Sequence, residues 1–283
     1  MNHKCLYCFA RLFSNLLEKH VEEEEKKIEL TKLFFRYISE IDTTLPSPVI
    51  ARDIHAMLRQ YLNNPDPYKE EKDSHNKLIL SVYDYLKEKI RNSSSPFDEA
   101  LKLTIAGNIM DFGPYNEFNI METIFQMGDM NIAINHSKEL QKQIEKAESI
   151  LYLGDNAGEI VFDRLFLETI AHPKVFFSVR GGPVINDATM EDAKMAGIDK
   201  MAKIIDNGYD APATIPEKSS EDFRRIYEKA DLIISKGMGN FEGLMHRKDE
   251  RIFFLLMVKC EVIGEHLGLN KGDIVIYNQN SRK

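Results

Sequence analysis

The sequence has few cysteines, no long apolar run and no excess of positive charge, and each absence excludes a class of protein. Three cysteines in 283 residues are too few for a disulfide framework. No stretch approaches the roughly 20 apolar residues that span a bilayer, and the opening MNHKCLYCFARLF lacks the pattern of a cleavable signal peptide. A net charge of −8 argues against a surface for nucleic acid or anionic membrane. We therefore expect a cytoplasmic protein that binds neither nucleic acid nor membranes.

Apolar residues in the first half of the chain recur at intervals of three and four, which predicts amphipathic helices. This spacing occurs in three segments, 5–20, 47–62 and 95–113. Ser47 and Ser95 each precede a proline, which favours them as helix N-caps with proline in the first turn. Residues 1–145 are therefore expected to form a helical N-terminal subdomain that contributes to a substrate pocket.

The second half alternates between short strand-like runs and segments of helical composition. The strand-like runs, rich in β-branched and aromatic residues, are 150–155, 174–180, 201–206, 231–237, 251–258 and 273–278. Strands separated by helices predict a largely parallel sheet that is covered on both faces. Residues 146–283 are thus expected to form an α/β domain.

Polar and glycine residues follow three of these strands, at the edge where ligands bind in open parallel sheets. The first loop carries Asp155, Asn156 and Glu159, the second Gly181, Gly182, Asn186 and Asp187, and the third Lys236, Gly237, Gly239 and Asn240. Each residue alone is explained more simply as a helix cap or a turn residue. Together, oxygen ligands in two loops and a lysine in the third predict a site for a metal ion and a phosphate.

The residue types fit that chemistry. Mg²⁺ and Mn²⁺ prefer carboxylate and carbonyl oxygens, so Asp155, Asn156 and Asp187 are the candidate metal ligands. Lys236 would neutralise phosphate charge, with help from the loops that contain Gly181, Gly182 and Asn240. Glu159 lies about one helical turn after Asp155, where it would either orient a water or simply offset the helix dipole. Asp155, Glu159 and Asp187 are the candidate catalytic residues.

A second polar cluster lies in the helical half, in AGNIMDFGPYNEF. Asn108 and Asp111 are three residues apart and share a face if the helix continues, while Gly107 permits close approach of another backbone. The alternative is an ordinary helix end at Gly113 and Pro114.

Four blocks of the sequence resemble the damage-control phosphatases, also known as domain of unknown function 89 and as the acidic residue methyltransferase-like family. The blocks are AGNIMDFG at 106–113, GDNAGE at 154–159, VRGGPVINDAT at 179–189 and SKGMGNFEGL at 235–244. The opening CLYC is similar to that of the stand-alone microbial branch.

This resemblance implies a helical portion followed by a three-layer α/β/α domain, and a divalent-metal-dependent phosphatase for small phosphorylated metabolites such as sugar or cofactor phosphates, including damaged ones. It implies that Asp155, Asn156 and Asp187 hold the metal, which would be Mn²⁺, Mg²⁺, Co²⁺ or Ni²⁺. Lys236 would contact the phosphate, and the block with Gly107, Asn108 and Asp111 would lie on the substrate side.

Two other functions remain open at the level of sequence. One is an S-adenosylmethionine-dependent carboxyl methyltransferase, although GDNAGE lacks the spacing of a nucleotide-binding glycine turn. The other is a non-catalytic metal- or metabolite-binding module. The Cys5-x-x-Cys8 pair, with His3 and His20 nearby in sequence, would be half of a zinc site, a redox pair or two small residues near a helix start.

Overall fold

The computed structural model of the chain describes residues 1–107 and 132–280. The residues pack as two units, an N-terminal unit (Met1–Pro67) and an α/β unit (Tyr68–Lys283). The domain boundary expected after residue 145 stays a prediction, and the packing units divide at a different place. No helix of the described ranges is both long enough and apolar enough to cross a membrane.

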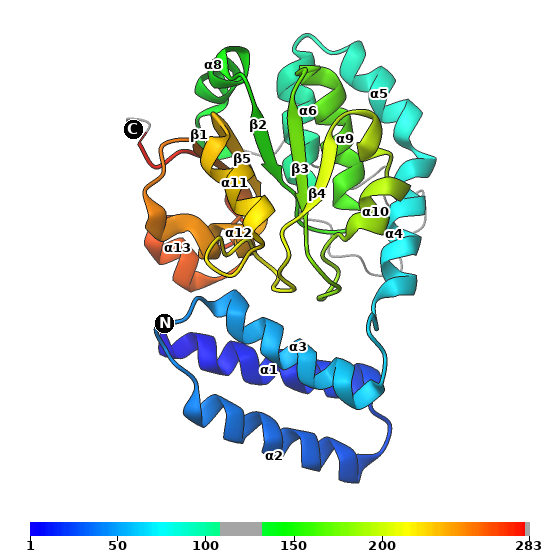
Figure 1. The fold of residues 1–283 in the computed structure, drawn as a ribbon, viewed down its shortest axis with the longest axis vertical. Coiled ribbons are helices and arrows are strands. Elements are labelled where there is room, and N and C mark those ends of the chain that lie inside the picture. The colour runs from blue at the N-terminus through cyan, green and yellow to red at the C-terminus, as the bar shows by residue number, and fades with distance from the viewer. Residues whose placement is uncertain (108–131, 281–283) are drawn as a thin grey trace. The chain divides into compact units, whose positions relative to one another are not determined.

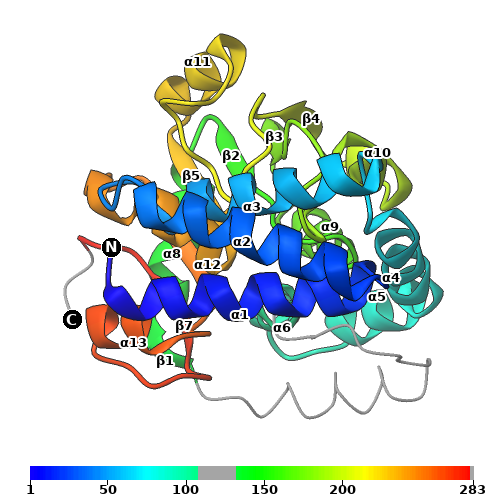
Figure 2. The same cartoon turned by 90° about the horizontal axis from the view of Figure 1, so that it is seen from below.

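The N-terminal unit consists of three helices, α1 (His3–His20), α2 (Glu24–Glu40) and α3 (Ser47–Leu62), which run along one another in Figure 2. The Phe13 ring on α1 stacks on the Phe34 ring on α2 with centroids 4.6 Å apart, so the apolar stripes form a core of their own. Ser47 is the first residue of α3 rather than its N-cap, which is Pro46.

Three further helices belong to the α/β unit, namely α4 (Lys69–Ser81), α5 (Tyr83–Arg91) and α6 (Pro96–Ala106). Ser95 is the N-cap of α6, as predicted from the Ser-Pro pair. Their apolar faces pack against α9 (Glu159–Ile170), where the Phe97 and Phe166 rings lie 5.7 Å apart. The helical first half of the sequence is therefore divided between the two units.

The α/β unit contains a seven-stranded sheet with the order β1-β7-β6-β5-β2-β3-β4. The strands are β1 (Ile132–Asn135), β2 (Ile150–Leu153), β3 (Val175–Val179), β4 (Lys203–Asp206), β5 (Leu232–Lys236), β6 (Ile252–Met257) and β7 (Ile274–Tyr277). All neighbouring pairs are parallel except β6 and β7, which are antiparallel. The six predicted strands are present, whereas β1 was not predicted.

Both faces of the sheet are buried (Figure 1). The remaining helices are α8 (Ser137–Lys146), α10 (Met190–Met195), α11 (Glu221–Lys229), α12 (Gly237–Leu244) and α13 (Glu261–Leu267). Ile150 and Tyr152 of β2 pack in one core with α5, α6, α8, α9 and α10, while Leu151 and Leu153 pack in a second core with α11, α12 and α13. The alternation of side chains along a strand thus produces three layers, and the predicted α/β class with an N-terminal helical region is confirmed.

The sheet places five strand ends at one edge. Strands β4, β3, β2, β5 and β6 are adjacent and mutually parallel, so their carboxyl ends and the loops that follow them lie together. Strand β7 runs the other way, so its carboxyl end lies at the opposite edge.

Candidate active site

The loops after β2 and β3 are joined to each other by their backbones. The N–H of Ala188 donates to the carbonyl oxygen of Asp155 at 2.8 Å, and Asn156 and Asp187 form an isolated antiparallel bridge. Asp155 and Asp187 are both buried. The structure therefore brings together the three residues that the sequence predicted as metal ligands.

Arg180, the residue directly after β3, lies between the two aspartates. It is buried, and its Nε donates to Asp187 Oδ1 at 2.6 Å while Nη2 donates to Asp155 Oδ1 at 3.2 Å. Its Nη1 donates to Asn240 Oδ1 at 3.0 Å. A buried guanidinium that bridges two carboxylates fixes their spacing, because its donors form a rigid planar fork. Arg180 was not among the predicted site residues, although it directly follows a predicted strand.

Lys236 lies at the end of β5 and is fully buried within a second charged cluster. Its ammonium donates to the Thr104 carbonyl oxygen at 2.8 Å, to Asp163 Oδ1 at 2.9 Å and to Glu159. Tyr152 donates to the same Asp163 oxygen at 2.7 Å. Burial favours a lower pKa for Lys236, but Asp163 and Glu159 raise its pKa above the ordinary value.

These partners bear on the expected role of Lys236. An ammonium has three donors, and all three are directed at groups within the chain. Contact with a substrate phosphate therefore stays a prediction that requires Lys236 to exchange one of these partners.

Glu159 connects the two clusters. It begins α9, is fully buried and pairs with Lys236, and its Oε2 accepts from Asn156 Nδ2 at 3.1 Å. A surface acid that only offsets a helix dipole would not be buried in this way. The geometry makes Glu159 a neighbour that orients the Asn156 amide.

The carboxylates crowd one another. The pKa of Asp155 is raised to about 7, because burial and the charges of Glu159 and Asp187 raise it more than Arg180 and Lys259 lower it. Burial likewise raises the pKa of Asp187, against the effect of Arg180. The pKa values of Asp155 and Asp187 rise because negative charge is unfavourable in this buried, acidic site, and a bound cation would stabilise the ionised carboxylates.

The donor set fits a hard divalent cation. No three acidic, histidine or cysteine side chains of the described residues group as a complete metal site, but the predicted set needs only Asp155, Asp187 and the amide oxygen of Asn156. The chain also leaves room for the Asp155 carboxylate, since a Cβ on Gly237 would lie 1.9 Å from Asp155 Oδ2. Gly237 has φ 78°, which suits glycine alone. The residues present therefore fit a metal ion.

The comparisons with known proteins agree with this arrangement. Residues 1–275 match the model of the damage-control phosphatase ARMT1-like domain. The chain belongs to this family. A damage-control phosphatase of Pyrococcus horikoshii is 34% identical over 97% of this chain and 96% of its own length. A damage-control phosphatase of Archaeoglobus fulgidus is 35% identical over 80% of each chain.

A solved structure and a further relative are also similar to this chain. The crystal structure of the Pyrococcus horikoshii protein, described as a DUF89 family protein, superimposes with a TM-score of 0.92 at 32% identity and covers 99% of both chains. An uncharacterized protein of Methanocaldococcus jannaschii is 36% identical over 96% of this chain and 93% of its own length. The resemblance stated from the four sequence blocks is confirmed.

Two of the predicted phosphate-binding residues, Asn240 and Gly181, form hydrogen bonds within the chain. The Asn240 side chain is buried and bonds to Arg180 and to the Gly154 and Lys236 carbonyl oxygens. The N–H of Gly181 donates to Asn207 Oδ1 at 3.0 Å, and a Cβ there would lie 2.4 Å from the Tyr209 nitrogen, so its turn needs glycine. Gly182 follows it and is partly exposed. Phosphate binding by these three stays a prediction.

Asn108 and Asp111 lie outside the described residues. Gly107, which precedes them, is described, and a Cβ there would lie 2.8 Å from the Phe162 ring and 3.1 Å from Glu159 Cγ. Close approach of the chain at Gly107, expected from the sequence, is therefore observed against the first turns of α9.

Lys259 is a charged residue at the same sheet edge that was not among the predicted site residues. It lies in the loop after β6, its side chain is exposed, and its charge opposes the pKa rise of Asp155. Within ranges 1–107 and 132–280 it has no hydrogen bond or ion pair. Lys259 could have been found from the sequence, because it directly follows the predicted strand 251–258 and so lies at the same sheet edge as the other loops.

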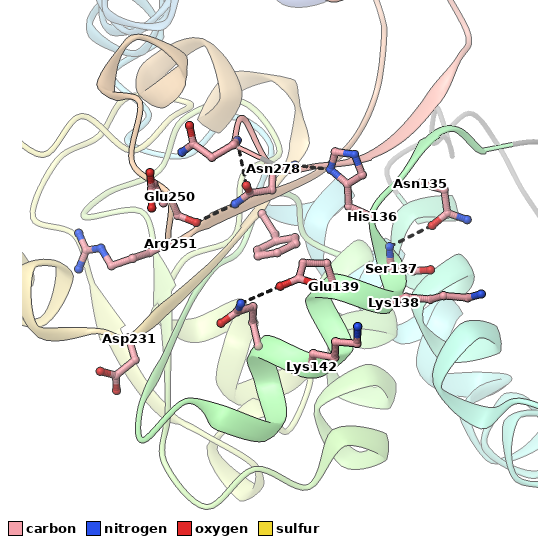
Figure 3. A pocket seen from close by; sticks show the side chains of 13 residues that line it. Asn135, His136, Ser137, Lys138, Glu139, Lys142, Asp231, Glu250, Arg251 and Asn278 are labelled. Atoms are coloured by element: carbon pink, nitrogen blue, oxygen red, sulfur yellow. Dashed lines mark hydrogen bonds between the residues drawn. The ribbon is translucent and has the colours of Figure 1, made fainter. Parts of the chain in front are cut away.

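A separate hollow lies at the opposite edge of the sheet (Figure 3). It has a volume of about 850 Å³ and is lined by residues that include His136, Asp231, Arg251 and Asn278. The Asn278 side chain donates to the Glu250 and Ile252 carbonyl oxygens and accepts from the Asn280 N–H at 3.0 Å. None of the predicted site residues lines this hollow.

The Cys5 and Cys8 pair lies on α1 of the N-terminal unit. Cys5 is partly exposed and Cys8 is exposed, and neither forms a disulfide in the described part of the chain. The role of the pair stays open.

Proposed function

We propose that this chain is a divalent-metal-dependent phosphatase for small phosphorylated metabolites, including sugar or cofactor phosphates and damaged forms of them. The observation that carries the proposal is the meeting of Asp155, Asn156 and Asp187 at adjacent strand ends. Two relatives that match at 34% and 35% identity are named damage-control phosphatases. These names favour a phosphatase over a carboxyl methyltransferase or a non-catalytic module.

The residues divide into three roles. Asp155, Asn156 and Asp187 would hold Mn²⁺, Mg²⁺, Co²⁺ or Ni²⁺, and when bound such an ion supplies Lewis-acid polarisation of a phosphoryl oxygen and activation of the attacking water. Arg180 holds the two carboxylates apart from each other, and Glu159 orients the Asn156 amide. This arrangement is built before the substrate arrives, so little reorganisation is needed during the reaction.

Lys259 is our candidate for the first contact with the substrate phosphate. Lys236 is buried and engaged with Glu159 and Asp163, whereas Lys259 is exposed at the same edge and close enough for its charge to affect Asp155. An exposed lysine beside the carboxylates would attract a phosphate monoester and offset part of its charge. A cytoplasmic location, with no nucleic acid or membrane partner, remains our expectation.

The test is release of inorganic phosphate from an aryl phosphate and from a panel of sugar and cofactor phosphates, with each of the four metals and with chelator. We expect metal-dependent release by the wild type and loss of activity in Asp155→Asn, which keeps the shape of the side chain. The matched control is Asp231→Asn, since Asp231 accepts from Ser149 at the opposite edge of the sheet. Undiminished hydrolysis by Asp155→Asn would refute the site, and saturable S-adenosylmethionine binding without turnover of any phosphate would refute the function.

A further inference from the structure

A buried asparagine on α4 reaches the loop that carries two of the expected metal ligands. Asn76 is fully buried, and its Oδ1 accepts from the Gly158 N–H at 2.6 Å. Gly158 follows Asn156 by two residues and is the N-cap position of α9, with φ 77°. In a capping box the side chain of the third helical residue accepts from the N-cap N–H. That residue is Val161 in α9, so the acceptor comes instead from 82 residues away.

The same asparagine also reaches the loop that carries the third expected ligand. Its Nδ2 donates to Asp192 Oδ1 at 3.1 Å. Asp192 Oδ2 accepts from the Thr189 N–H at 2.9 Å and from its hydroxyl at 2.7 Å, which forms a capping box at the start of α10. Thr189 follows Asp187 by two residues. Asn76 thus bonds directly to the loop after β2, and it reaches the loop of Asp187 through Asp192 in the first turn of α10.

A buried ion pair supports these hydrogen bonds of Asn76. Lys72, one turn before Asn76 on α4, donates to Asp192 Oδ2 at 3.3 Å, and both side chains are about 1% exposed. Since one helix supplies both the charge and the amide, α4 is positioned relative to both loops at once.

We propose that Asn76 is a positioning residue for the metal site: by bonding to Gly158 and Asp192 it fixes the spacing between the loop of Asp155 and Asn156 and the loop of Asp187. This inference rests on the proposed function. The Asn76 side chain has one acceptor group, which bonds to the loop after β2, and one donor group, which bonds to Asp192 at the start of α10. Residues that orient metal ligands in this way commonly alter metal affinity or activity by about 10- to 100-fold when removed.

The test compares two buried asparagines in the full-length chain. Asn76→Leu removes the hydrogen bonds to Gly158 and Asp192. Asn278→Leu is the matched control, because Asn278 is also buried and its side-chain amide also takes part in two hydrogen bonds, donating to the Glu250 and Ile252 carbonyl oxygens at the opposite edge of the sheet. We expect calorimetric titration to show Mn²⁺ binding weakened about 10- to 100-fold in Asn76→Leu and unchanged in Asn278→Leu. Should Asn76→Leu fail to fold, Asn76→Ser is measured instead, since the serine hydroxyl is too short to reach both partners.

The outcomes separate this inference from the function on which it rests. Wild-type Mn²⁺ affinity in a folded Asn76 variant would overturn the positioning role while leaving the phosphatase proposal intact. Equal weakening by Asn76→Leu and Asn278→Leu would also overturn it, because the effect would then reflect general destabilisation. Absence of Mn²⁺ binding and of phosphate release in the wild type would instead overturn the proposed function. Reduced kcat with an unchanged KM in Asn76→Ser would support a role exerted through the metal ligands.

Discussion

Gly237→Ala is expected to damage the metal site without changing any ligand or charge. A Cβ at this position would lie 1.9 Å from Asp155 Oδ2 and 2.4 Å from Asp155 Cγ, distances that force the carboxylate or the backbone to move. The backbone is also left-handed there, at φ 78°. Two costs therefore apply, backbone strain and collision with Asp155.

Gly268→Ala separates the two costs. Gly268 has a similar φ of 70°, but no atom lies within 4 Å of the added Cβ. Backbone strain alone costs about 1–2 kcal/mol, and forcing an extra carbon into a packed site adds about 1–3 kcal/mol. We expect the unfolding free energy of Gly268→Ala to fall only by the cost of backbone strain, about 1–2 kcal/mol. That of Gly237→Ala should fall by roughly 2–5 kcal/mol, the sum of both costs.

Urea unfolding of both variants measures these losses, and calorimetric titration with Mn²⁺ measures the site. Gly268→Ala should keep wild-type Mn²⁺ affinity, whereas Gly237→Ala should bind Mn²⁺ more weakly because Asp155 is displaced. Equal stability losses together with unchanged Mn²⁺ affinity in both variants would refute the reasoning.

Three further predictions follow from the described contacts. Lys236→Met should destabilise the chain by about 3–5 kcal/mol in urea unfolding, because it leaves Glu159 and Asp163 buried without their partner; a loss as small as that of the exposed-lysine control Lys271→Met would contradict this. Burial, followed by the charges of Arg59 and His20, lowers the pKa of His55 to about 4. The neutral His55 therefore contributes fully to the free energy of unfolding above pH 6.5, and about 3 kcal/mol of this free energy is lost as the pH falls to 4. The wild type and His55→Leu should differ in the pH dependence of the unfolding free energy, and parallel pH profiles would contradict the lowered pKa. Lys259→Gln should raise KM for phosphorylated substrates with little change in Tm, since the side chain is exposed; an unchanged KM would remove Lys259 from the site.

The sequence predicted the elements whose pattern is local. Helices with apolar stripes and strands such as β2 and β5 were predicted because their side-chain periodicity is visible in a short window. Strand β1, Ile132–Asn135, was missed because it has four residues at the edge of the sheet, and only its pairing with β7 identifies it. The antiparallel direction of β7 likewise depends on tertiary pairing with β6.

The sequence also predicted which loops meet, because carboxyl ends of parallel strands share an edge. It did not predict which side chains bond to which. Lys236 ends a strand and Asn240 lies in the helix that follows it, near the same sheet edge as Asp155, yet both side chains bond to groups within the protein. Arg180 and Asn76 carry no motif of their own in the sequence, and their importance is visible only when the partners from distant segments are in place.

The most direct measurement for the central claim is anomalous diffraction from a crystal grown with Mn²⁺ and inorganic phosphate. We expect a manganese peak within coordination distance of Asp155, Asn156 and Asp187, with phosphate beside it and within reach of Lys259. A manganese ion bound elsewhere, with Arg180 still bonded to both aspartates and no ion between these three residues, would contradict the account.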